Sequence, residues 1–162
     1  MPGAFRIKKK SDPVRAVVQR VSRASIAVGE ETVGEIGSGL LALVGVGQED
    51  SLSDAEELAA KIVHLRVFAD SAGRMNLSLL DCGFSLALVS QFTLYGDVRK
   101  GRRPYFGDAA TPEVAAPLIE SLASAARALG VVVACGRFQA QMDVSLVNEG
   151  PVTILLDTKR HF

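Results

Sequence analysis

The segment SQFTLYGD, residues 90–97, places polar side chains directly after an apolar run. Residues 86–89 are all apolar, and Ser90, Gln91 and Thr93 follow them. Hydroxyl and amide groups at the end of a buried strand need hydrogen-bond partners. They either close the edge of the strand or face a ligand, and the residue types alone leave both interpretations open.

The side chains that usually carry acid-base, nucleophilic or metal chemistry are scarce in this sequence. Of its two histidines, His161 is the penultimate residue, and His64 lies in a predicted helix without a cysteine or histidine at metal-ligand spacing. A histidine-based triad would have to use His64, whose helix has no feature of a catalytic element. The sequence contains no Walker loop and no G-x-G-x-x-G turn. We therefore expect no metal and no cofactor.

A Gly-Pro pair interrupts a strand-like segment near the C-terminus, VNEGPVTILL. Proline cannot donate a ladder hydrogen bond and glycine weakens a strand interior, so Gly150 and Pro151 do not suit a regular strand. A sequence that needed only a hairpin would usually use Asn-Gly or Asp-Gly. Since about 5% of X-Pro bonds in folded proteins are cis, the sequence by itself favours a trans bond here.

Charge is balanced, with 18 Lys and Arg against 18 Asp and Glu, so the net charge does not identify a nucleic-acid partner. Two basic clusters are local exceptions: RIKKK in the first ten residues, and RKGRRP, which contains Arg99, Lys100, Arg102 and Arg103. Each is either a solvated surface or a site for phosphates. We expect residues 1–13 to form a flexible basic arm and residues 14–162 to form a single domain.

Apolar periodicity predicts an α/β fold with a mixed, largely antiparallel β-sheet in layers and two helices on one face. The expected strands are a hairpin that turns at Gly29 and segments at residues 40–47, 65–68, 84–94, 131–138, 142–147 and 151–156. No apolar run of about 18 residues and no signal-peptide pattern is present, so we expect a soluble, cytoplasmic protein without membrane association.

Capping signals predict the limits of the two helices. Ser53 and Glu56 fit a capping box at the start of the first helix. The second helix is expected to begin at Thr111, followed by a proline at the first helical position, and to end at Gly130. Pro117 predicts a kink or a fresh start within it.

Two motifs resemble those of the D-aminoacyl-tRNA deacylases. SQFTL, at residues 90–94, is similar to the Ser-Gln-x-x-Leu motif of that family, and NEGPVT, at residues 148–153, resembles its Gly-cis-Pro motif. The similarity extends over residues 14–157, because RAVVQRVSRAS, GLLALVGVG, MNLSLLD, RKGRRP and MDVSLV also occur in family order. Residues 1–13 have no usual counterpart, and three positions depart from the common pattern: Gly96, Tyr105 and Glu149.

The resemblance implies hydrolysis of the ester that joins a D-amino acid to the terminal adenosine of a tRNA, and it leaves glycyl-tRNA open as a second substrate. Backbone N–H groups of Phe92 and Thr93 would hold the oxyanion, a contribution of about 3 kcal/mol per donor. Ser90 and Gln91 would shape the loop. The ester is already activated and the adjacent ribose hydroxyl can assist, so no side-chain base is needed. Thr93 as a covalent nucleophile is the competing interpretation.

The resemblance also implies binding residues and a homodimer. Phe138 and Met142 match positions that line the family's adenine pocket, and Arg20 matches a position that braces the Gly-Pro loop. Gly150 and Pro151, joined by a cis bond, would enter the active site of the other subunit and exclude L substrates. Contacts with acceptor-stem phosphates are expected from the loop residues Arg99, Lys100, Arg102 and Arg103.

Two further hypotheses belong to other classes. The basic loop and the absence of a visible acid or base also fit an RNA-binding module without catalysis. An esterase that uses Thr93 as its nucleophile and acts on small esters is the other. If the protein is a deacylase, as the resemblance implies, its expected partner is the 3′-terminal adenosine of aminoacyl-tRNA.

Overall fold

The computed structural model describes residues 13–160, and its main sheet is built around one long strand, β1 (Arg15–Val28). β1 pairs antiparallel with β2 (Glu31–Ile36), β3 (Gly39–Gly45) and β8 (Asp143–Asp157). The strand order is β2-β1-β3-β6-β7, with β8 also on β1, and β6 and β7 join in parallel. The remaining two strands of this sheet are β6 (Ser85–Ser90) and β7 (Val133–Cys135).

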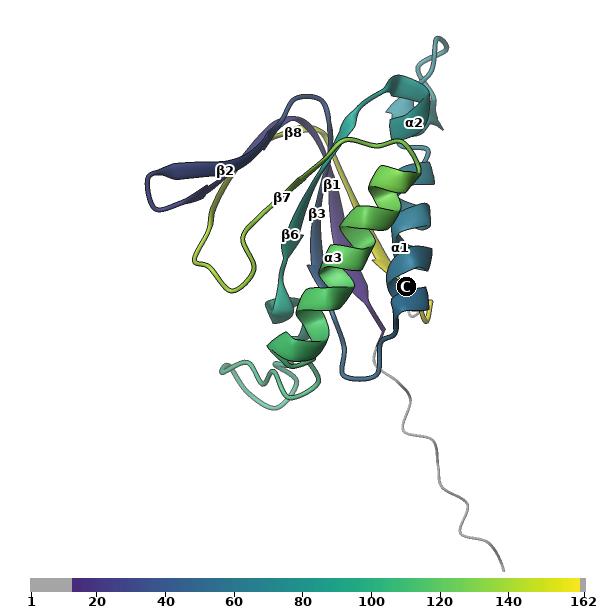
Figure 1. Cartoon of the computed structure of the whole chain (residues 1–162). Coiled ribbons are helices and arrows are strands. Elements are labelled where there is room, and N and C mark those ends of the chain that lie inside the picture. Colours follow the sequence, from purple (N-terminus) through teal and green to yellow (C-terminus); the bar gives the residue numbers. More distant parts are fainter. Residues whose placement is uncertain (1–12, 161–162) are drawn as a thin grey trace, which may run out of the picture.

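Two long helices, α1 (Leu52–His64) and α3 (Pro112–Ala128), cover one face of the sheet (Figure 1). The predicted fold class is therefore confirmed. The structure adds short elements that periodicity did not predict, because three or four residues are too few to show a period: α2 (Leu79–Cys82), the 3₁₀ turn η1 (Phe92–Tyr95) and β5 (Met75–Leu77). β5 pairs with β4 (Phe68–Ala69), a two-residue strand at the end of the segment 65–68 where a strand was predicted. Within the described residues no helix is long and apolar enough to cross a membrane.

The central strands are buried on both faces, which explains their unbroken apolar sequence. Leu40 and Leu88 pack into the larger core, between the sheet and the helices. Their neighbours Leu41 and Ala87 point the opposite way, into a second core formed with the β1–β2 hairpin and β8. Because side chains alternate along a strand, a strand with two covered faces has no polar alternation.

The start of α3 is as predicted, with Thr111 as its cap and Pro112 at its first position, but the start of α1 and the interior of α3 differ from the sequence predictions. α1 is capped by Ser51, whose backbone N–H donates to the Asp54 carboxylate at 2.9 Å, so the capping box predicted from Ser53 and Glu56 is wrong by two residues. Asp54 is buried and stands at the position that reaches back to the cap. α3 is continuous from Pro112, so the fresh start at Pro117 is wrong. A proline in the second turn removes one helical hydrogen bond without ending the helix.

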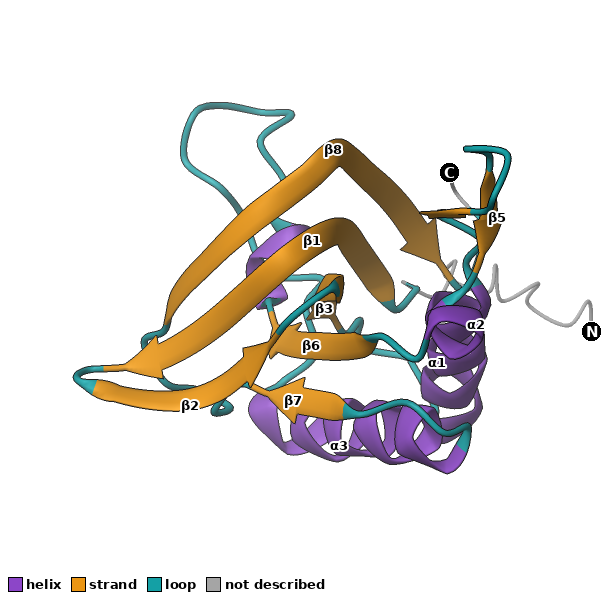
Figure 2. Cartoon of the chain, turned by 90° about the horizontal axis from the view of Figure 1, so that it is seen from above, coloured by secondary structure: helices purple, strands orange, loops and turns teal. Residues whose placement is uncertain are grey.

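The C-terminal region forms two strands where three were predicted, because β8 continues across the Gly-Pro pair. Gln19 pairs with Thr153 and Val21 pairs with Asn148, so residues 149–152 leave the ladder while their flanks stay paired. Gly150 has a φ of +127°, and the Gly150–Pro151 bond is cis. β8 and β1 run side by side and bend together (Figure 2). The predicted arm, except for Pro13, lies outside the described residues.

A buried carboxylate lies in the loop between β3 and α1. Asp50 accepts a hydrogen bond from the Gly47 N–H at 2.6 Å, and its other oxygen is buried without a partner among the described residues. Burial raises the pKa of Asp50 from 3.8 to about 7, and the nearby Asp54 adds to the effect. The folded protein therefore binds this proton more tightly than the unfolded chain does.

The first prediction concerns the close approach of β3 to β6. A Cβ on Gly39 would overlap the carbonyl oxygen of Ser85 and lie 2.9 Å from its carbonyl carbon, and backbone atoms cannot rotate aside. We expect Gly39→Ala to lower the free energy of unfolding by about 1–3 kcal/mol. Gly37→Ala is the matched control, since no heavy atom lies within 4 Å of its Cβ. Equal urea midpoints for the two variants would contradict the packing argument.

The second prediction concerns pH. Because the folded pKa of Asp50 exceeds the unfolded one, the contribution of this carboxyl to stability should fall as pH rises from 3.8 to about 7, and that contribution should be lost above this range. Asp50→Asn removes this titration, so the variant should gain stability relative to the parent as pH rises, by at most about 1.4 kcal/mol per pH unit. Urea unfolding at several pH values measures this difference. An identical pH dependence for the parent and the variant would contradict this account.

Candidate functional site

The chain turns sharply where β6 ends, and hydrogen bonds fix that turn. The N–H of Gln91 donates to the carbonyl of Val44 on β3 at 2.7 Å, one residue beyond the β3–β6 ladder. The η1 turn then begins, and the N–H of Leu94 donates back to the Gln91 carbonyl at 3.2 Å. The first N–H groups of such a turn, those of Phe92 and Thr93, have no acceptor within it. They are available to bind an oxygen atom of a ligand.

Two neighbouring strands hold the η1 turn in place. Gly45 of β3 lies so close that a Cβ on it would stand 3.0 Å from the Gln91 carbonyl oxygen. From β1, the Arg15 guanidinium donates to the Leu94 carbonyl at 3.3 Å and lies 4.6 Å from the centre of the Tyr95 ring. That ring is only 3% exposed. The backbone of η1 is therefore held by close packing against β3 and by the Arg15 side chain of β1.

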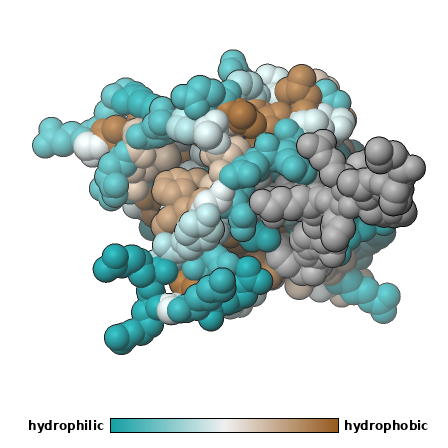
Figure 3. All heavy atoms as spheres, turned by 90° about the horizontal axis from the view of Figure 1, so that it is seen from below, coloured by the Kyte–Doolittle hydropathy of each residue, from teal (hydrophilic) through white to brown (hydrophobic). Residues whose placement is uncertain are grey.

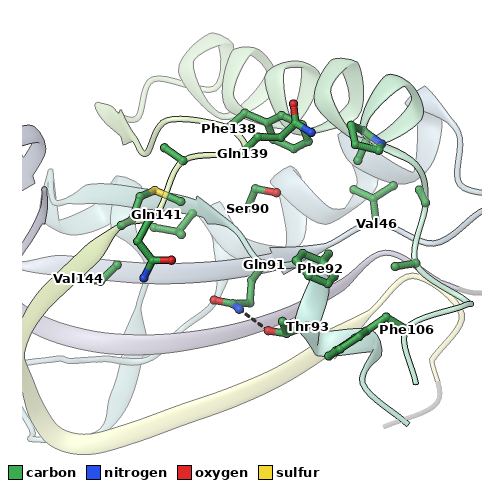
Figure 4. Close-up of a pocket in the computed structure, with 17 residues that line it drawn as sticks. Val46, Ser90, Gln91, Phe92, Thr93, Phe106, Phe138, Gln139, Gln141 and Val144 are labelled. Carbon is green, nitrogen blue, oxygen red and sulfur yellow. Dashed lines mark hydrogen bonds between the residues drawn. The ribbon is translucent and has the colours of Figure 1, made fainter. Parts of the chain in front are cut away.

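A cavity of about 730 Å³ lies between the end of β6, the η1 turn, the start of α3 and the loop that joins β7 to β8. Figure 4 shows Phe138 and Gln139 on one side, Phe92 and Thr93 on the other, and Ser90 between them. The structure thus brings six of the predicted site residues to one cavity: Ser90, Gln91, Phe92, Thr93, Phe138 and Met142.

The side chains that line the cavity are apolar or uncharged. None of the 17 described residues that line it carries an ionisable side chain. Its polar side chains are hydroxyls and amides, and the Gln91 amide nitrogen donates a hydrogen bond to the Thr93 hydroxyl oxygen (Figure 4). An amide that donates to Thr93 cannot take its proton, so this contact does not activate Thr93 as a nucleophile. Within residues 13–160 no three His, Cys, Asp or Glu side chains form a metal-binding cluster.

The Gly-Pro loop and Arg20 lie elsewhere, since none of them lines the cavity. Arg20 donates from Nε to the Glu149 carbonyl at 3.0 Å and from Nη1 to the Val67 carbonyl at 2.7 Å. A Cβ on Gly150 would stand 3.1 Å from Nη2 of the same arginine. Arg20 thus ties the loop at residues 149–152 to the segment before β4, and Gly150 and Pro151 remain exposed.

The basic loop projects beyond η1. Two backbone hydrogen bonds between Asp97 and Tyr105, 2.8 and 2.9 Å long, close its base. Arg99 pairs with Asp97 at 2.6 Å, and hydrogen bonds from the Arg99 side chain hold the pKa of Asp97 well below its usual range. The other three basic side chains of the loop are exposed and form no ion pair within the described residues: Lys100, Arg102 and Arg103. Apolar surface and projecting hydrophilic side chains share this end of the molecule (Figure 3).

Several cavity residues were not predicted from the sequence. Phe106 lies on the wall and meets the Phe92 ring edge to face, with 5.2 Å between the centroids. Gln139, at a φ of +63°, and Gln141 also line the cavity. A lone aromatic residue in a loop and two glutamines carry no periodic signal, although both glutamines lie between Phe138 and Met142, two of the predicted site residues.

The sequence profile of the D-Tyr-tRNA(Tyr) deacylase family matches residues 17–157. This match defines an enzyme class that hydrolyses aminoacyl esters of tRNA. The chain belongs to the D-aminoacyl-tRNA deacylase family, so the predicted family and enzyme class are confirmed.

Curated relatives agree with this assignment, and two solved structures share the fold. A D-aminoacyl-tRNA deacylase of Roseiflexus sp. (strain RS-1) is 61% identical over 145 residues, which cover 90% of this chain and 94% of the relative. The deacylase of Bacillus licheniformis is 58% identical and covers 90% and 99%. A structure titled c-Myc DNA Unwinding Element Binding Protein superposes with a TM-score of 0.83, 40% identity and coverage of 88% and 97%. A probable eukaryotic D-amino acid tRNA deacylase superposes with a TM-score of 0.80 at 18% identity, covering 90% and 100%.

Proposed function

We propose that the cavity binds the 3′ end of a D-aminoacyl-tRNA and hydrolyses its ester with main-chain donors and without a side-chain acid or base. The observation that carries this proposal is the lack of any ionisable side chain among the described residues of the cavity wall. The same wall contains Phe92 and Thr93, the two residues whose N–H groups have no acceptor within the η1 turn. A site of this kind suits a substrate that brings its own activated ester.

The reaction requires few protein groups. The terminal adenine lies against Phe138 and Met142, and the ester carbonyl oxygen points to the N–H groups of Phe92 and Thr93. Water attacks the ester carbon, the two N–H groups stabilise the negative charge on the oxygen, and the neighbouring ribose hydroxyl helps to position or deprotonate the water. When the tetrahedral intermediate collapses, the ribose oxygen takes a proton and the free D-amino acid leaves. Preorganised donors lower this barrier because they need no reorientation.

Chirality is set by a second subunit in this proposal. The exposed loop at residues 149–152 is separate from the cavity of its own chain, and Arg20 holds it through main-chain carbonyls. In a homodimer, Gly150 and Pro151 of one subunit lie beside the substrate α-carbon bound by the other and occupy the space of an L side chain. Backbone atoms cannot move aside as a side chain can, so an L substrate is rejected. Glycine has no side chain and is accepted.

The loop residues Lys100, Arg102 and Arg103 contact acceptor-stem phosphates, which gives affinity without sequence choice. Arg99 contributes less, since it is already paired with Asp97. Charged tRNA is a cytoplasmic substrate, and we place the enzyme in that compartment.

The third prediction tests the function itself. The enzyme should release the D-amino acid from D-aminoacyl-tRNA at least about a hundredfold faster than it releases the L-amino acid from matched L-aminoacyl-tRNA. That ratio corresponds to roughly 2.7 kcal/mol of discrimination between the two transition states. Binding of tRNA without release of amino acid would favour the RNA-binding module. Release from simple esters that lack the ribose, at the same rate, would favour the Thr93 esterase.

The fourth prediction concerns Thr93. If its backbone N–H is the working group, Thr93→Ala should keep kcat within about tenfold of the parent, whereas loss of a nucleophile lowers kcat by about 10⁴-fold or more. Single-turnover kinetics measures the difference, and Thr93→Ser, which keeps the hydroxyl, is the control. A covalent aminoacyl adduct on Thr93, detected by mass spectrometry, would reverse the assignment.

The fifth prediction concerns the shared site. Arg20→Ala frees the loop, Gly45→Val pushes the η1 turn away from β3 through its close approach to the Gln91 carbonyl, and each variant alone should be nearly inactive. Co-expression of the two should restore about one quarter of the parent activity, because half of the dimers are mixed and each mixed dimer has one intact site. The two variants carried on one chain serve as the control and should stay inactive. A monomeric mass in light scattering, or no recovery in the mixed dimer, would contradict the cross-subunit loop.

A further inference from the structure

An exposed aromatic pair lies at one end of the cavity. Phe92 is 57% exposed, and its ring meets Phe106 at 5.2 Å and an interplanar angle of 70°. Both residues line the cavity, on the side away from Gln141 and Val144 (Figure 4). Phe106 fixes the orientation of Phe92 through the edge-to-face contact, while a large part of Phe92 stays open to solvent. The mechanism above uses the backbone of Phe92 and leaves both rings without a role.

The pair stands between the cavity and the basic loop. A Cβ on Gly96 would lie 3.1 Å from the Phe106 ring and 3.6 Å from Pro104, so the ring packs against the base of that loop. The bridge between Asp97 and Tyr105 closes the same base. The aromatic pair therefore lies between the part of the cavity proposed for the adenine, at Phe138 and Met142, and the unpaired basic side chains of the loop.

The inference that follows rests on the proposed function. A tRNA end that enters the cavity must then pass Phe92 and Phe106. Its adenosine lies against Phe138, its phosphates reach the basic loop, and the nucleotide next to the adenosine falls between these two points. We propose that Phe92 and Phe106 form a second subsite, on which the base of the penultimate nucleotide stacks. That base is a cytosine, because tRNAs end in CCA.

The chemistry of the pair fits such a base. Every nucleobase has a π-face, and stacking on an aromatic side chain contributes about 1–3 kcal/mol per base without hydrogen bonds. The rings provide no donor or acceptor, so the subsite binds the shared end of all tRNAs and does not select among them. Phe92 carries both the stacking ring and an N–H that faces the oxyanion, so a stacked cytosine also sets the register of the ester.

The experiment measures affinity with non-hydrolysable compounds in which D-phenylalanine is joined by an amide to 3′-amino-adenosine. Three probes are compared: the adenosine compound, its CpA extension, and an extension in which an abasic ribose phosphate replaces the cytidine. The abasic probe supplies the phosphate, so the ratio of its Kd to that of the CpA probe isolates the base. We expect a ratio of about ten for the parent protein, within the range for one stacked base.

Phe106→Leu, which keeps apolar bulk and removes the ring, should reduce this ratio to about two. Phe138→Leu, the matched control, should weaken all three probes and leave the ratio unchanged. A parent ratio near one overturns the subsite, and this test needs no variant to fold. A ratio that survives in Phe106→Leu overturns it also. If the adenosine compound itself does not bind, the proposed function fails and the subsite fails with it, whereas binding without a base effect rejects the subsite alone.

Discussion

The hydrogen bond from the Gln91 N–H to the Val44 carbonyl is the contact on which the site depends. It extends the parallel pairing of β3 and β6 by one residue, and the chain then turns into η1. The missing side chain at Gly45 lets the turn approach β3 closely, and Arg15 holds its far end from β1. The N–H groups of Phe92 and Thr93 are thus positioned by the sheet. Donors fixed in this way do not have to reorganise when charge develops on a substrate.

A wall without ionisable groups changes how such an enzyme can be controlled. Most hydrolases tune the pKa of a side chain through burial or a charged neighbour. Here the polar wall consists of hydroxyls, amides and main chain, so the pKa shift of Asp50, in a loop outside that wall, concerns stability and not the chemistry. The scarcity of histidine in the sequence also fits a mechanism that uses no side-chain base. The reactive bond and its assisting hydroxyl both belong to the proposed substrate.

The sequence predicts this molecule well where the signal is local or periodic. The core strands and both long helices follow from apolar spacing, and six wall residues follow from the family resemblance. Errors arise where distant contacts decide. The strand-breaking pair at residues 150 and 151 is correctly seen as a disruption, but pairing with β1 resumes on both sides, so β8 stays one strand. The contacts of Arg20 join carbonyls 47 and 129 residues away in the chain, and only the family resemblance, not a local pattern, indicated the contact with the Gly-Pro loop.

A single chain holds two incomplete features: a cavity without the Gly-Pro loop, and a loop without a cavity of its own. β8, which carries the loop, also exposes Val147 and Leu155 at 41% and 51%. In the proposed two-fold dimer the same surface meets itself, so one interface would complete two sites at once. Selectivity then depends on main-chain atoms, which single side-chain substitutions in the cavity cannot retune. In this proposal selectivity depends on Arg20, because its two carbonyl contacts tie the loop to the segment before β4.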